Sequence, residues 1–364
     1  TEGFVGGNVD ATVYTQIAHN GKFVRNLHPV RGHDNISKQL QFLSNRNFDL
    51  QNDTIFLVTI TEGAADTTVT AQALVSNLPY GVPPNGKQGD TDTTDATKGL
   101  QTNDGRVLGA IQKDDWIQFV STTAHGTNAN AAIYHGFIHD AQGAAPKVSA
   151  RVFSHPVRDY GYPNITWSGV HPNQIQCLIG FNFTSIQGHP GMGAVQLGND
   201  TSFSNAIDLI NGTTHVDRHS DSYERWGDYF AIQPMFDEDG AIIPSESWMA
   251  GFYGDGPQQN RTYISQVFST DTVVPLYANG GQLYPNPAYD LDIVTITFNL
   301  EQDQRIEARL YNTAGALVQE LAGRDLPAGP AELYLHLGTL AAGNYVVRLE
   351  GSTGFVKTER LLKL

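Results

Sequence analysis

A three-strand pattern recurs along the first 270 residues, and it limits the fold more than any other feature of the chain. Each unit opens with a short strand-like segment, continues after a polar turn with a more apolar one, and ends with a third. The repeat length is roughly 60 to 70 residues, long for a four-stranded propeller blade but compatible with one. The pattern therefore predicts an all-β, propeller-like domain over residues 1–270. The segments are 39–43, 54–60 and 68–75; 107–111, 116–120 and 131–138; 164–167, 175–183 and 192–197; and 228–232, 247–253 and 261–268.

A further segment at residues 11–17 matches only the third strand of a unit. It predicts four blades plus a partial one, and therefore an incomplete propeller. Because an open ring leaves a sheet edge exposed, we expect the edge at residues 11–18 to be paired, for example by another chain. Residues 77–103 interrupt the repeat with Pro, Gly, Asn and Asp, which predicts a long surface loop.

Composition excludes some classes of function. The formal net charge is -15, and a field of that sign repels phosphate backbones, so nucleic acid is not expected as a partner. The single cysteine, Cys177, lies in an apolar run, which favours a small core residue over a nucleophile. No apolar stretch is long enough to span a bilayer. The chain opens at Thr1 without a Met or an apolar leader, as expected for a mature or trimmed product.

The last part of the chain has a different pattern. Residues 271–282, with Pro275 and Gly280, are expected to form a linker. Short alternating segments then follow about ten residues apart, separated by Gly, Pro and Asn, which predicts a small antiparallel sandwich over residues 283–364. These segments are 293–298, 305–311, 331–337, 343–349 and 355–361.

Several motifs in this region occur together. The region opens with Tyr284-Pro285-Asn286-Pro287, and Leu340-Ala341-Ala342-Gly343-Asn344-Tyr345 with Arg348 follows near its end. Together with Lys363 at the basic finish, they resemble the type A C-terminal sorting domain of type IX secretion. Leu364 departs from that family's pattern by following the expected terminal lysine.

The resemblance implies an Ig-like sandwich that directs the protein across the outer membrane and is often cleaved on arrival. It implies a secreted or cell-surface protein whose partner is the type IX secretion machinery.

The repeat region resembles, more loosely, the sialidase-like propellers. The matching residues are Arg225-Trp226-Gly227-Asp228-Tyr229, followed by an acidic turn and Trp248-x-x-Gly251-x-Tyr253. The Asp-box turn of that family is not present in clear form, and its catalytic arginines and Tyr/Glu pair cannot be placed. Sialidase activity is therefore not carried over. A carboxylate beside Arg225, Glu224 or Asp228, could be catalytic, but it is interpreted as part of a structural ion pair.

Other short patterns suggest binding or modification. Two acidic runs could offer oxygen ligands to calcium, although neither has the full spacing of a calcium loop, and no cofactor is certain. Their residues are Asp90, Asp92 and Asp95 in one run and Asp237 and Asp239 in the other. Two Asp-Thr-aliphatic triplets, at Thr54 and Thr272, resemble the O-glycosylation sites of bacteria that use this secretion system. Trp167, Trp226 and Trp248 could stack on sugars if exposed, but their recurrence near strand starts favours core packing.

Two further patterns are interpreted as surface features. Gly81 to Lys87 fits a P-loop by letter, but Gln88 follows where Ser or Thr is needed and no helix pattern comes next. His215 and His219 are four residues apart in a polar loop, where a metal site is not favoured.

Three functions follow from these patterns. The first is a non-catalytic extracellular protein, acting in adhesion, in binding or as a structural part of a surface assembly with other copies or other surface proteins. The second is a propeller glycoside hydrolase, which an arginine cluster around a carboxylate and a tyrosine would favour. The third is a carbohydrate-binding propeller, which exposed tryptophans would favour.

Overall fold

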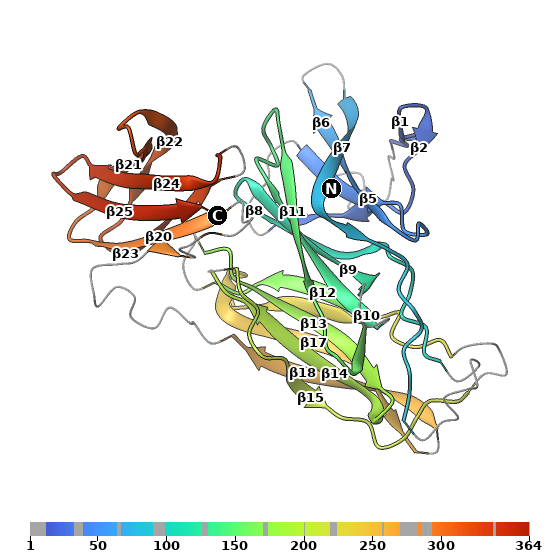
Figure 1. The fold of residues 1–364 in the computed structure, drawn as a ribbon. Helices are drawn as coiled ribbons and strands as arrows, with labels where there is room; N and C mark the ends of the chain where they lie inside the picture. Colours follow the sequence, from blue (N-terminus) through green and yellow to red (C-terminus); the bar gives the residue numbers. More distant parts are fainter. Residues whose placement is uncertain are drawn as a thin grey trace. The chain divides into compact units, whose positions relative to one another are not determined.

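The computed structural model describes most of the chain. The described residues are 12–32, 39–63, 67–89, 99–125, 130–169, 174–199, 201–218, 224–256, 258–269, 283–284, 288, 293–337 and 340–363. Within these ranges the chain forms strands and no helix (Figure 1). The chain divides into two compact units, residues 1–84 with 102–156 and residues 85–101 with 157–364.

Two meander sheets build the first unit. One has the strand order β3-β5-β6-β7, and the other β11-β10-β9-β8-β4, in which β4 runs parallel to β8. The first sheet contains β3 (His28–Pro29), β5 (Gln39–Asn45), β6 (Asn52–Glu62) and β7 (Thr67–Tyr80). The second contains β4 (Arg31–Gly32), β8 (Val107–Lys113), β9 (Trp116–Ala124), β10 (Ala131–His139) and β11 (Lys147–Phe153).

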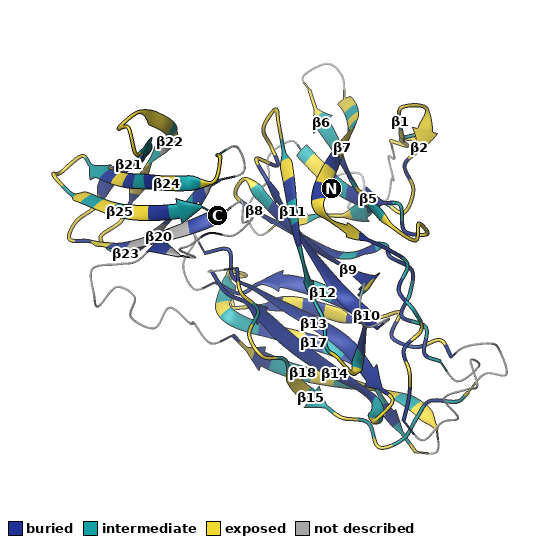
Figure 2. Ribbon diagram, viewed as in Figure 1, coloured by how far each residue is buried: buried dark blue, intermediate teal, exposed yellow. Residues whose placement is uncertain are grey.

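The core of the first unit lies between these two sheets. Ile55 and Leu57 of β6 share one hydrophobic cluster with Phe119 of β9 and Tyr134 of β10. The alternate side chains of β6, Phe56 and Val58, point to the opposite face. This strand is therefore buried on both faces, as Figure 2 shows for β9 and β10 as well.

The N-terminal segment covers that opposite face, and here one prediction was wrong. Residues 12–17 form no strand and are mostly exposed, so they offer no sheet edge for a partner to pair. Instead Ile17 and Val24 pack against the cluster of Phe56 and Val58. Between them, β1 (Ala18–His19) and β2 (Lys22–Phe23) form a small hairpin. Its Asn20-Gly21 turn has φ of 48° and 74°, the left-handed values that a type I′ hairpin turn requires.

Two further antiparallel sheets belong to the second unit. One follows the order β12-β13-β14-β15 and the other β16-β17-β18. Tyr162, Leu178 and Met192 from the first sheet share a hydrophobic cluster with Ile232 and Met249 from the second. The bounds are β12 (Arg158–Trp167), β13 (Cys177–Ser185), β14 (Gly188–Leu197), β15 (Ile207–Ile210), β16 (Ala231–Phe236), β17 (Ile242–Asp255) and β18 (Gln259–Phe268).

The segment predicted as a surface loop at 77–103 is in part buried structure. β7 runs to Tyr80, and Gly86 forms a bridge with Leu100, which is fully buried and also pairs with Glu224. The buried Gln88 amide donates to the Val216 carbonyl at 3.0 Å and accepts from the Val216 N–H at 2.8 Å. Polar composition predicted exposure, but backbone pairing and these reciprocal bonds make burial favourable.

The C-terminal strands form a two-sheet sandwich around a separate core. One sheet has the order β19-β20-β23 and the other β22-β21-β24-β25. Phe298, Leu310, Val347 and Leu335 belong to the cluster between them. The bounds are β19 (Leu283–Tyr284), β20 (Ile293–Leu300), β21 (Gln304–Asn312), β22 (Leu317–Leu326), β23 (Gly329–His336), β24 (Gly343–Gly351) and β25 (Val356–Lys363).

The all-β class is confirmed, with meander sheets ahead of a C-terminal sandwich. Each predicted repeat segment overlaps a strand of the structure, and so do the five segments of the sandwich. Strands that were not predicted include β11, β15 and β22, and the proposed linker 271–282 lies outside the described residues.

Candidate functional site

The motif residues of the C-terminal region hold one loop of the sandwich. Tyr345 lies in β24, and its hydroxyl donates to the carbonyl oxygen of Ala341 at 2.7 Å. Lys363, at the end of β25, donates from Nζ to the carbonyl oxygens of Leu337 at 2.5 Å and Leu340 at 2.8 Å. Two motif positions far apart in sequence therefore bind the carbonyl groups that precede β24.

Gly343 and Tyr284 occupy strand positions in the same sandwich. Gly343 begins β24 and pairs with Lys363, while Tyr284 in β19 pairs with Thr295 of β20. Pro285, Asn286 and Pro287 lie outside the described residues.

Arg348 belongs to an ion-pair network that the sequence pattern does not predict. Its Nη2 lies 2.7 Å from Oε1 of Glu350, whose other oxygen lies 2.6 Å from Nη1 of Arg309. Arg309 also pairs with Glu307 at 2.7 Å and with Glu320 at 2.8 Å, and the hydrogen bond to Glu320 raises its pKa. Arg309 and Arg348 are cross-strand partners in β21 and β24, a register that sequence alone does not show.

The segment Arg225-Trp226-Gly227-Asp228-Tyr229 has a structural role in the second unit. Arg225 pairs with Asp228 at 3.0 Å, and both side chains are at least partly exposed. Trp226 is buried in the core cluster, which contradicts a sugar-stacking role for it. Gly227 has φ of 79°, and a Cβ there would lie 2.4 Å from the Tyr162 ring, so only glycine fits this turn.

The three tryptophans considered for sugar stacking differ in exposure. Trp167 and Trp226 are buried, as core packing predicts, whereas Trp248 is 42% exposed. The prediction of a core position was therefore wrong for Trp248. Its place on β17 turns it away from the cluster that holds its neighbour Met249.

The acidic turn after β16 is stabilised by its own carboxylate. Asp237 accepts backbone N–H bonds from Asp239 at 3.0 Å and from Ala241 at 2.8 Å. Such bonds are typical of a turn closed by an Asp side chain. Asp90, Asp92 and Asp95 lie outside the described residues, and the part of the chain that is described contains no group of three or more His, Cys, Asp or Glu able to hold a metal.

Thr54 is the described member of the two candidate O-glycosylation sites. It is half-buried at the start of β6, its hydroxyl lies 3.4 Å from Oδ1 of Asp53, and its backbone carbonyl accepts from the Tyr80 hydroxyl at 2.6 Å. Thr272 lies outside the described residues.

Three other residues were considered as functional candidates from the sequence, and none of them is placed in a functional site by the described residues. Cys177 is fully buried, and burial raises its thiol pKa, so it is a core residue as expected. Lys87, the last residue of the P-loop-like pattern, donates its backbone N–H to Asp159 at 3.0 Å beside a strand bridge rather than opening a helix. His219 lies outside the described residues, so its relation to His215 stays untested.

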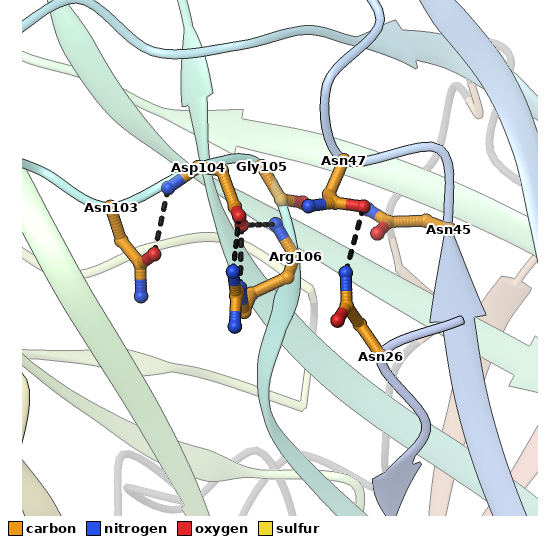
Figure 3. A network of polar contacts seen from close by, with 7 residues as sticks. All are labelled: Asn26, Asn45, Asn47, Asn103, Asp104, Gly105 and Arg106. Atoms are coloured by element: carbon orange, nitrogen blue, oxygen red, sulfur yellow. Dashed lines mark hydrogen bonds and ion pairs between the residues drawn. The ribbon is translucent and has the colours of Figure 1, made fainter.

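An asparagine-rich network in the first unit was not predicted (Figure 3). Asn26 donates to Asn47 Oδ1 at 3.0 Å, and Asn45 donates to the Gly105 carbonyl at 2.6 Å. Asp104 binds Arg106 through its carboxylate, with 2.7 Å from Arg106 Nε to Oδ1. The network joins the turn after β5 to the turn before β8, and its role is to hold these two turns together.

Residues 282–363 match the family model of the secretion system C-terminal sorting domain. A comparison with curated proteins found no match. Within the described ranges no helix has both the length and the apolar composition to cross a membrane.

Several solved structures are similar to this chain at low sequence identity. PorZ, an essential surface component of the type IX secretion system of Porphyromonas gingivalis, is 11% identical with a TM-score of 0.19. The match covers 92% of this chain and 59% of PorZ. Latent dimeric PorU of the same bacterium is 11% identical, with a TM-score of 0.20, covering 95% of this chain and 33% of PorU.

Sucrose-6-phosphate hydrolase from Lactobacillus gasseri is 10% identical with a TM-score of 0.26, covering 93% of this chain and 86% of that enzyme. Scores this low place no functional residue on this chain. By contrast, the family match and the sandwich geometry coincide at residues 283–363. The chain therefore ends in a secretion system C-terminal sorting domain, which marks it for type IX export to the cell surface or the extracellular space.

Proposed function

We propose that the chain is a non-catalytic extracellular or cell-surface protein that acts in binding, adhesion or the structure of a surface assembly. The observation that carries the proposal is the presence of a sorting domain together with repeat sheets in which the candidate carboxylate Asp228 is bound by Arg225. In this proposal the sorting domain directs the protein out of the cell, and the repeat sheets provide the surface that binds or adheres there.

The carboxylates beside arginine support a structural role. Arg158 of β12 binds Asp208 of β15 through two bonds, at 2.6 and 2.8 Å, and this bidentate pairing joins the two edge strands of one sheet. Arg158 also lies 4.5 Å over the Phe183 ring. The other pair, Arg225 with Asp228, is confined to one turn.

A glycoside hydrolase needs two carboxylates that are not tied up in structural ion pairs. One must be free to protonate the leaving oxygen and a second must be free to act as base or nucleophile. The candidate Asp228 has one carboxylate oxygen bound by Arg225 at 3.0 Å, and Asp208 is bound by Arg158 at 2.6 Å. Neither carboxylate therefore fits that chemistry, and the hydrolase is the weaker proposal.

Carbohydrate binding without catalysis is the second candidate function. Trp248 favours it, because an exposed indole on a sheet offers a flat apolar surface to a ligand. Calcium binding at the acidic runs and O-glycosylation at Thr54 and Thr272 remain predictions. Both are compatible with a structural role and with carbohydrate binding.

Export is tested with the full chain in a bacterium that has type IX secretion. We expect the full chain outside the cell and a version ending before residue 283 inside it, with a host lacking the secretion system as the control. Export of the truncated version would show that residues 283–364 are not needed for secretion and would overturn their assigned role.

The non-catalytic role is tested on the exported full chain with chromogenic glycosides, sialosides included. We expect no turnover. Turnover by the native chain that a heat-denatured sample lacks would overturn the non-catalytic role and favour the hydrolase.

A further inference from the structure

The outer face of the β16-β17-β18 sheet carries an unusual set of exposed side chains. Because side chains alternate along a strand, Ser247, Met249 and Gly251 of β17 face the core, and Glu246, Trp248 and Ala250 face outward. Trp248 occupies the middle strand of the three. It is therefore central on this face rather than at an edge.

Cross-strand register places an amide on each side of the indole. Trp248 pairs with Gln233 of β16 and with Gln266 of β18. Gln233 is exposed, and Gln266 is half-buried. A flat aromatic ring thus lies between two side chains that can both donate and accept hydrogen bonds.

Gln266 is held in place by neighbours on the same face. Its Nε2 lies 3.0 Å from Oε2 of Glu246 and 3.0 Å from Sδ of Met235. These contacts join all three strands and fix the orientation of the amide. A side chain oriented before binding loses less conformational entropy when a ligand arrives.

Two alanines and an isoleucine lie along one flank of Trp248. This next row of the sheet consists of Ala231, Ala250 and Ile264, and on the other flank Phe268 pairs with Glu246. Ile264 and Phe268 are 65% and 61% exposed, so the face is apolar with a polar central row. Glu246 is the only charged residue among these described positions.

We propose that this face, defined by Gln233, Glu246, Trp248, Ala250 and Gln266, binds uncharged pyranose units of a polysaccharide. The C–H groups on one side of a pyranose carry partial positive charge and suit the negative face of the indole. Hydroxyl groups at the ring edge suit the amides of Gln233 and Gln266. Glu246 repels anionic sugars, so neutral sugars, N-acetylated ones included, bind better than sialic or uronic acids.

This inference rests on the proposed extracellular function and names its ligand class. The test uses the purified full chain and soluble oligosaccharides of glucose, N-acetylglucosamine, xylose and mannose, with sialylated oligosaccharides for comparison. Binding is measured by calorimetry. We expect at least one neutral series to bind, and Trp248→Ala to weaken that binding about tenfold or more, as lost aromatic stacking does.

The matched control is Phe48→Ala, which removes a 73% exposed aromatic side chain from the first unit. It should leave the affinity unchanged, and Trp248→Phe should retain part of it. Gln233→Ala should weaken binding severalfold without changing the fold. Circular dichroism of each variant distinguishes a lost contact from a lost structure.

Three results would overturn the proposal: no binding to any neutral series, binding that Trp248→Ala leaves unchanged, or a preference for sialylated ligands. A fourth would be self-association in sedimentation that Trp248→Ala abolishes, because the face would then join two copies of the chain. Cleavage of a bound oligosaccharide would instead contradict the proposed non-catalytic role, but it would not contradict the proposed binding face. The two proposals therefore fail separately.

Discussion

Lys363 donates a hydrogen bond from its ammonium group to the carbonyl oxygen of Leu340 at 2.8 Å. The same group reaches Leu337 at 2.5 Å, and Tyr345 binds Ala341 beside them. The terminal lysine of the sorting motif is thus part of the folded sandwich. Its sequence position alone would suggest a free basic end.

Lys363→Met should loosen the sandwich, because it leaves two backbone carbonyl groups without a charged donor. Hydrogen bonds from charged groups contribute about 1.5 to 3 kcal/mol, so we expect a loss of that order. Faster exchange of the backbone amide hydrogens in β24 and β25 of the full-chain variant would show this loss of stability. Arg305→Met is the control, since Arg305 and Asp325 form an exposed ion pair worth roughly 0 to 1 kcal/mol. Equal exchange in both variants would contradict this role.

Gly227→Ala should destabilise the second unit more than Gly240→Ala does. Both glycines have left-handed φ, 79° and 80°, and so carry a similar backbone cost of roughly 1 to 2 kcal/mol on substitution. A Cβ at Gly240 meets nothing within 4 Å, whereas one at Gly227 meets the Tyr162 ring at 2.4 Å. Overpacking adds about 1 to 3 kcal/mol at Gly227 alone. Urea unfolding should give different midpoints, and matching midpoints would refute the close approach.

The stability of the first unit should fall in acid because of His135. Burial, followed by the charge of Arg151, lowers the pKa of His135 to about 3, while Nε2 lies 2.7 Å from Oε1 of Gln118. The unfolded chain, with the ordinary value of 6.5, takes up the proton first. Between about pH 6.5 and 3 the unfolded state therefore binds more protons, and the free energy of unfolding decreases as the pH falls.

The slope from this residue is at most about 1.4 kcal/mol per pH unit. His28 adds to it in the same direction, because burial, and then Arg31, lower its pKa to about 4. His135→Gln should flatten the pH profile relative to the native chain, whereas parallel profiles would speak against the assignment. An NMR titration of the native chain gives an independent check, since the His135 ring should stay neutral above about pH 4.

Tyr134→Phe should cost about 1 to 2 kcal/mol in the first unit, as expected when a buried hydroxyl is lost. The Tyr134 hydroxyl lies 2.7 Å from Ser76 Oγ and 3.0 Å from the Leu78 carbonyl oxygen, and burial raises its pKa to about 12. Tyr229→Phe removes a hydroxyl from a side chain that is 83% exposed and should change nothing measurable. Denaturant titration of both variants makes the comparison, and a neutral Tyr134→Phe would argue against these bonds.

The strands were predictable because their signal is local. Alternation and apolar runs bounded by turn residues located the repeat segments and five strands of the sandwich. β22 was not predicted because Gln319, Glu320 and Arg324 make its sequence polar, as is typical of a turn region. The strand exists because it pairs with β21, which is a long-range contact.

The first residues were mispredicted for a related reason. Residues 11–17 have the alternation of a strand, yet Ile17 and Val24 cover the face of Phe56 and Val58. Burying an apolar face already present on the sheet competes with extending its edge. Local pattern does not show which of the two is favoured.

The sequence by itself determined the all-β class, the positions of most strands and the sorting domain, because periodicity and motif spacing are carried by neighbouring residues. Only the tertiary structure decided that Trp226 is buried while Trp248 is exposed between Gln233 and Gln266. It also decided that Arg309 joins Glu307, Glu320 and Glu350. The physical reason is register: a shift of one residue in strand pairing turns every side chain to the other face, and long-range packing sets that register.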